Sequence, residues 1–210
     1  MPKPVTALPT ALPTPAAREP LHTRRYDFRG FRRKDGLFDI EGRMVDTKDH
    51  AFPNEWRGMV EPGDPVHDMQ IRLTLDDHFT VMDIAVVTAA SPFAICADIT
   101  PAFDALKGAT VAKGWSRTLR NSFSGAHGCT HHVEMLRAMG TVAFQTIYGY
   151  REKAKRDAGL SDTDGPPADA TPGKRPGFLD TCHALASDGD VVRTHWPAFY
   201  QPSDDMKKPG

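Results

Sequence analysis

The chain has 210 residues, of which 40% are hydrophobic and 25% charged, and its formal net charge at pH 7 is −1. This near-neutral composition provides no global electrostatic field to recruit nucleic acid or an anionic membrane, so we expect neither as a partner. The 3 cysteines are an odd number and do not suggest a disulfide framework, which favours a reducing compartment.

Two segments of biased composition divide the chain. Residues 1–23 are rich in Pro, Ala and Thr and predict a flexible N-terminal lead whose prolines interrupt any secretory signal. Because no segment approaches the roughly 20 apolar residues of a membrane helix, we expect a cytoplasmic protein. Gly, Pro and Asp indicate a linker or loop over 156–177. We therefore expect a core domain over 24–155 and a C-terminal segment over 178–210 that docks on it.

Strand patterns fill the first half of the predicted core. Residues 37–45 predict a first strand, and a loop rich in Gly and Pro follows it. From Val66 to Leu75 apolar and polar residues alternate, which is typical of a half-buried strand. A turn at Asp76-Asp77-His78 and an apolar run over 79–88 predict that this strand forms a hairpin.

Helical patterns fill the second half of the core. Ser91-Pro92 and Thr100-Pro101 each predict the start of a helical segment, and residues 113–123 predict an amphipathic helix. The longest helix is expected from about Thr130 to Tyr150 or beyond, with one buried stripe formed by Val133, Leu136, Gly140, Phe144 and Ile147. After the linker, 178–186 predicts a short helix and 191–195 a short strand. Strands followed by helices predict an α+β fold, with about three antiparallel strands and helices packed on one face.

The main candidate site precedes the longest predicted helix, in the run Gly125-Ala-His-Gly-Cys-Thr-His-His132. Cys129 falls at the start of that helix, where unpaired N–H groups and the helix dipole stabilise a thiolate. A thiolate with neutral imidazoles from His127, His131 or His132 suits zinc or iron, and His132 competes with His131 for the same role. Alternatively, Cys129 is a small hydrophobe at the core edge, which is the commoner role of such a cysteine, and the histidines lie at the surface.

Two other elements carry candidate ligands. Where a loop enters the strand at Pro65-Val-His-Asp-Met69, His67 and Asp68 could both bind a metal, or the carboxylate could orient the imidazole. Alternatively, Asp68 caps a turn and His67 is exposed. A further cysteine lies just beyond the last hairpin strand. Because these elements can converge at one end of a small sheet, we group as candidate metal ligands Cys129, His131, His67, Asp68, Cys96 and His132.

Acidic residues near the first strand form a competing constellation. Asp39 and Glu41 share a strand face, which suits paired-carboxylate catalysis, although Arg43 and Arg72 could simply neutralise them. Asp46 belongs to the same acidic stretch and is interpreted as the start of a turn. Other signals are weaker: Cys182-His183 is a further possible ligand pair, and the GxGxxG, Walker, GxSxG, HExxH and CxxC motifs are missing.

Five short runs of the sequence belong together: Asp35-Gly-Leu-Phe-Asp-Ile-Glu-Gly42, Asp46-Thr-Lys48, Pro65-Val-His-Asp-Met69, Arg72-Leu-Thr74 and Gly128-Cys-Thr-His131. In combination they resemble a bacterial family known as domain-of-unknown-function family 2889. The resemblance extends from about Arg25 to Ile147 and resumes over Leu179–Pro197. It implies no particular activity.

The order of elements also resembles the NifU-type iron–sulfur scaffold proteins, a NifU/SufE-like fold. That resemblance implies ligands before the second strand, at the end of the third strand and at the start of a long helix. The corresponding positions are His67 with Asp68, then Cys96, then Cys129 with a neighbouring His. The resemblance implies a ligand set of three cysteines plus an aspartate. In this sequence the first position has no Cys, and Cys96 comes several residues later than the pattern of those scaffolds requires. The resemblance therefore implies either a site for a single metal ion or the same fold without a metal, rather than a site for an iron–sulfur cluster.

The residues leave three functions open. The first is a metal-binding protein of unassigned activity, with zinc favoured over iron because zinc needs no redox partner; an open coordination position would polarise a carbonyl or activate water. The second is an enzyme that acts on a small molecule with Cys129 as nucleophile and His127 or His131 as base. The third is an accessory subunit without catalysis, in which tryptophans anchor a protein partner; the chain offers Trp56, Trp115 and Trp196.

Overall fold

The computed structural model describes residues 12–112, 114–159 and 175–202. Residues 1–11 of the predicted N-terminal lead and most of the predicted linker lie outside these ranges. Residues 12–21 are exposed and precede the first strand without forming a helix or strand. Of the helices in the described ranges, none is long and apolar enough to cross a membrane.

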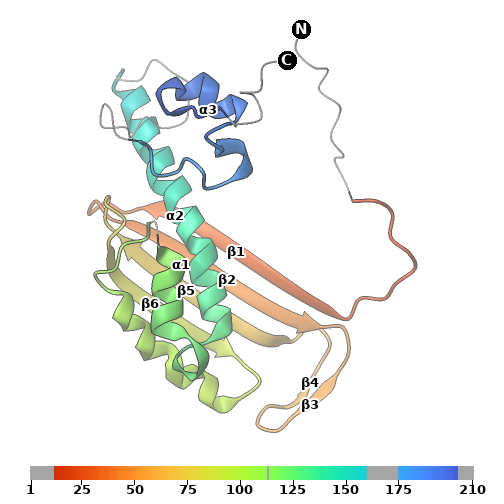
Figure 1. Cartoon of the computed structure of the whole chain (residues 1–210). Coiled ribbons are helices and arrows are strands. Elements are labelled where there is room, and N and C mark those ends of the chain that lie inside the picture. The colour runs from red at the N-terminus through yellow and green to blue at the C-terminus, as the bar shows by residue number, and fades with distance from the viewer. Residues whose placement is uncertain (1–11, 113, 160–174, 203–210) are drawn as a thin grey trace.

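The centre of the fold is a four-stranded antiparallel sheet with the order β1-β2-β5-β6. Its strands are β1 (His22–Arg32), β2 (Phe38–Lys48), β5 (Pro65–Leu75) and β6 (Val81–Ala90). A small hairpin, made of β3 (Phe52–Asn54) and β4 (Gly58–Val60), interrupts the connection from β2 to β5 (Figure 1). The α+β class and the antiparallel sheet are therefore confirmed.

Helices lie against one face of this sheet (Figure 1). In chain order they are the 3₁₀ helix η1 (Ala94–Leu106), α1 (Trp115–Phe123), the 3₁₀ turn η2 (Gly125–His127) and α2 (Thr130–Asp157). The long helix α2 crosses β1, β2 and β5, whereas η1 packs against β6. The N-terminus of α2 consequently lies over one end of the sheet.

The core forms because alternate residues of the central strands face the helices. Phe38, Ile40 and Met44 of β2 are buried, as are the alternating apolar residues of β5 that the sequence predicts. Gly42 lies in the same row, where an added Cβ would lie 2.9 Å from the Phe28 ring and 3.2 Å from Met139 Sδ. A residue without a side chain at this position lets α2 approach β2 closely.

The sheet has one strand more than the sequence predicts. Strand β1 pairs with β2 along its whole length, yet none of its residues is buried and several are arginines. A strand of this kind shows no clean alternation of apolar and polar residues, because it lies at the edge of the sheet. The missing hydrophobic pattern is the reason that the sequence did not reveal β1.

The predicted turn between the last two sheet strands is confirmed. Asp76 Oδ1 accepts hydrogen bonds from the backbone N–H groups of His78 and Thr80, at 2.8 and 2.7 Å. Phe79 has a φ of 65°, so β6 begins at Val81 rather than at Phe79. The two helical segments expected after this strand form one 3₁₀ helix, η1, with Pro101 inside it.

Two predictions of secondary structure in the C-terminal segment are wrong. Residues expected to form a strand form the short helix α3 (Asp190–His195), and the helix expected over 178–186 is reduced to turns and η3 (His183–Leu185). A final 3₁₀ turn, η4 (Pro197–Phe199), follows. Two consecutive valines suggested a strand, but burial of Val192 against Leu179 and Trp196 overrides that preference.

Candidate metal centre

The candidate site begins as a row of three side chains across neighbouring strands. Arg24 on β1 is the cross-strand partner of Asp46 on β2, and Asp46 is the partner of His67 on β5. Asp46 lies two residues beyond the buried Met44 and is itself 2% exposed, so it faces the helices. The row therefore lies under the N-terminal turn of α2.

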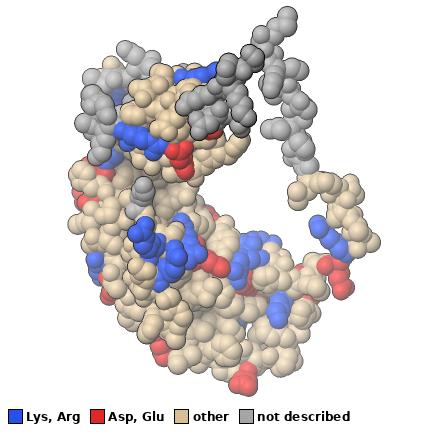
Figure 2. Space-filling view, viewed as in Figure 1, with Lys and Arg blue, Asp and Glu red and all other residues tan. Residues whose placement is uncertain are grey.

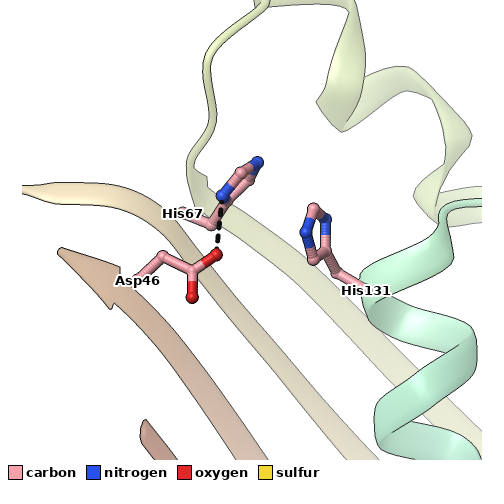
Figure 3. Close-up of side chains that lie close together, drawn as sticks. All are labelled: Asp46, His67 and His131. Carbon is pink, nitrogen blue, oxygen red and sulfur yellow. Dashed lines mark hydrogen bonds and ion pairs between the residues drawn. The ribbon is translucent and has the colours of Figure 1, made fainter. Parts of the chain in front are cut away.

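His131, in that first turn of α2, completes a compact group. Asp46, His67 and His131 each offer one metal-ligand atom, and these atoms lie within 4.8 Å of one another. His67 Nδ1 is 3.0 Å from Asp46 Oδ2, and the ring centroids of His67 and His131 are 4.1 Å apart. Figure 3 shows the three side chains converging from β2, β5 and α2.

The carboxylate of Asp46 is held by several nitrogen atoms. Arg24 donates from Nε to Oδ1 and from Nη2 to Oδ2, both at 2.7 Å, and His22 Nε2 lies 3.3 Å from Oδ1. Burial alone would raise the pKa of Asp46, but the hydrogen bonds and charge of Arg24 outweigh it and hold that pKa below its ordinary value. Asp46 is therefore a carboxylate at neutral pH.

The two imidazoles of the group are neutral at the same pH. Burial lowers the pKa of His67, and the neighbouring His131 lowers it further, while Asp46 acts in the opposite direction. Burial likewise lowers the pKa of His131, with the charge of Arg24 as the next cause. A neutral imidazole has a free lone pair, which is the form that binds a metal.

Cys129 lies at the edge of this group. It is the residue before α2, is half-buried and packs against the main core, and its side chain does not cap the helix. Its Sγ is 3.9 Å from His131 Nδ1. The sulfur thus contacts one member of the group and is not part of the three-residue set.

Three of the other predicted ligands do not belong to the group of Asp46, His67 and His131. Asp68 neighbours His67 in sequence but faces the opposite side of the sheet, where it accepts bonds of 2.9 and 2.7 Å from Arg43. His132 is fully buried, edge-on to the Phe103 ring, with Nε2 3.4 Å from the Val87 carbonyl oxygen. Cys96 is half-buried in η1 and does not belong to the set.

The remaining candidates do not belong to the group of Asp46, His67 and His131. Asp39 accepts a 2.7 Å bond from the Thr74 hydroxyl, and Glu41 is exposed on the sheet face away from α2. Cys182 and His183 lie in the C-terminal segment. Of the three tryptophans, only Trp56 is exposed. On the face shown in Figure 2, basic side chains lie next to acidic ones, as expected from the small net charge.

Sequence reasoning did not include Asp46 in the site because it interpreted 46–48 as a turn. The strand instead continues to Lys48, with a bulge between Asp46 and Thr47. The sequence did contain one indication of its position. Alternate residues of a strand share a face, so Asp46 lies on the same apolar face as Ile40 and Met44. A carboxylate on a core face needs partners, and a functional role is one reason for it to be there.

Comparison with known proteins assigns the chain to a family. A family described as "Protein of unknown function (DUF2889)" matches residues 22–145. The chain belongs to this family. The DUF2889 match runs from the first residue of β1 into α2 and includes Asp46, His67 and His131. Neither the curated proteins nor the solved structures contain a match to the chain, so the resemblance to NifU-type scaffolds gains no support.

Proposed function

We propose that this DUF2889 domain binds a single divalent metal ion, zinc in preference to iron, through Asp46, His67 and His131. The observation that carries the proposal is their convergence from three elements, with candidate ligand atoms within 4.8 Å of one another. Nitrogen and oxygen ligands of one tetrahedral zinc ion lie roughly 3.3 Å apart. A small inward movement would therefore bring all three onto one ion.

The protonation states support the same proposal. One carboxylate and two neutral imidazoles need to lose no proton before a metal binds. Two histidines and a carboxylate suit zinc and also ferrous iron, and we favour zinc because it requires no electron donor or acceptor. Three protein ligands leave a fourth position for water, where the ion would act as a Lewis acid.

Elemental analysis of full-length protein purified without chelator tests the proposal. We expect zinc at about one ion per chain, removable with chelator and restored by adding zinc. The variants Asp46→Asn, His67→Ala and His131→Ala should each fail to retain it. If the wild-type protein carries no stoichiometric metal and stripped protein takes up neither zinc nor ferrous iron, the proposal is rejected.

A second candidate function rests on the contact between Cys129 Sγ and His131 Nδ1. Here Cys129 is a nucleophile that attacks a small molecule, and His131 accepts its proton. Alkylation with iodoacetamide against pH, in a chain carrying Cys96→Ser and Cys182→Ser, separates the two candidates. Fast, metal-independent alkylation that slows with His131→Ala favours the nucleophile. Zinc retention in Cys129→Ser with slow alkylation favours the three-ligand metal site.

A further inference from the structure

Arg24 connects the strand and the helix that carry two of the proposed ligands. Its guanidinium makes two parallel 2.7 Å hydrogen bonds to Asp46, one to each carboxylate oxygen. Such a two-point contact fixes both the position and the plane of a carboxylate. Since the side chain of Asp46 is only 3% exposed and that of Arg24 30%, water competes weakly for these bonds.

The same guanidinium also reaches α2. Arg24 Nη1 donates to Glu134 Oε2 at 3.2 Å, and the Tyr26 hydroxyl donates to that same oxygen at 3.2 Å. Glu134 follows His131 by three residues, so both side chains project from the same side of the helix. Two residues of β1 therefore hold the first turns of α2 at the end of the sheet where His131 meets His67.

We propose that Arg24 is the positioning residue of the metal centre: it orients Asp46 directly and sets the place of His131 through Glu134. This inference rests on the proposed metal binding and adds to it the groups on which affinity depends. Partners that orient ligands typically contribute 10- to 100-fold to metal affinity. The positive charge of Arg24 opposes a nearby cation, but it is shared between two carboxylates and partly exposed, so orientation should dominate.

The test is cobalt binding to metal-stripped, full-length protein, followed by the visible absorption of the bound ion. Arg24→Gln should weaken cobalt binding by about 10- to 100-fold and change the absorption spectrum, which reports ligand geometry. Arg24→Lys restores the charge without the two-point contact and should recover only part of the affinity. The matched control is Arg29→Gln, on the same strand but paired with Asp27, and it should behave as wild type.

The possible failures are distinguishable. If wild-type protein binds neither zinc nor cobalt, the proposed function fails and this inference with it. If wild type binds cobalt and Arg24→Gln has the same affinity and spectrum, only the positioning role is overturned. Should Arg24→Gln not fold, Glu134→Gln tests the helix contact without touching Asp46. It should weaken cobalt binding severalfold, and wild-type affinity in it would also overturn the inference.

Discussion

The rings of His67 and His131 come from β5 and α2, and their centroids lie 4.1 Å apart. Burial opposes protonation of both rings, a charge on His131 further opposes protonation of His67, and the charge of Arg24 further opposes protonation of His131. Both pKa values are therefore lowered from the ordinary value of 6.5. This relationship makes the pair suitable for a metal at neutral pH and gives the first prediction.

Zinc should stay bound through mildly acidic conditions. Protons compete with the metal only as the pH approaches the lowered pKa values of His67 and His131, so half-release should occur below pH 6.5. Equilibrium dialysis of zinc-loaded protein over a pH series measures the midpoint. Release centred above pH 7 would contradict the assignment of these two imidazoles as ligands.

Removal of one imidazole should distinguish neighbouring histidines. His131→Ala deletes a proposed ligand and should reduce zinc affinity by at least 100-fold, since two ligands remain. His127→Ala is the control, because His127 precedes the same helix, in η2, but is exposed. Competition with a fluorescent zinc chelator gives both affinities. Equal losses in the two variants would show that the zinc is bound elsewhere.

Asp68 should contribute to stability and not to metal binding. Its carboxylate bonds to Arg43 on the sheet face away from α2. Because the Arg43 side chain is 56% exposed, Asp68→Asn should lower the free energy of unfolding by no more than about 1 kcal/mol. The zinc affinity of Asp68→Asn should equal that of wild type, whereas His67→Ala should abolish zinc binding. Urea unfolding and zinc titration of the two variants provide the measurements.

The fold was predictable where burial imposed a pattern. The alternation in β5 and the apolar stripe of α2 identified the elements that form the core, and Val133, Leu136 and Ile147 are buried as expected. β1 was not predictable in the same way, because an exposed edge strand carries no buried residue to mark it. The helix α3 was missed because its valines favour a strand, and the burial of Val192 in a small local cluster overrides that preference.

The site was predictable only in part, for reasons of geometry. Sequence reasoning included His67 and His131 because they lie at the start of a strand and of a helix. It could not place Asp46 beside His67, since strand register depends on the whole sheet. It also grouped Asp68 with His67, although successive residues of a strand face opposite sides. Register and side-chain direction thus decide which of the candidate ligands meet.

His132 gives a prediction that concerns stability alone. Burial lowers its pKa to about 4, from 6.5, and its Nδ1 has no hydrogen-bond partner among the described residues. Between these pH values the unfolded chain binds a proton that the folded chain does not, so the free energy of unfolding should fall by roughly 3 kcal/mol on acidification from pH 6.5 to 4. His132→Leu should remove that part of the slope in urea unfolding of metal-free protein. An unchanged slope would mean that His132 is protonated without cost in the folded state.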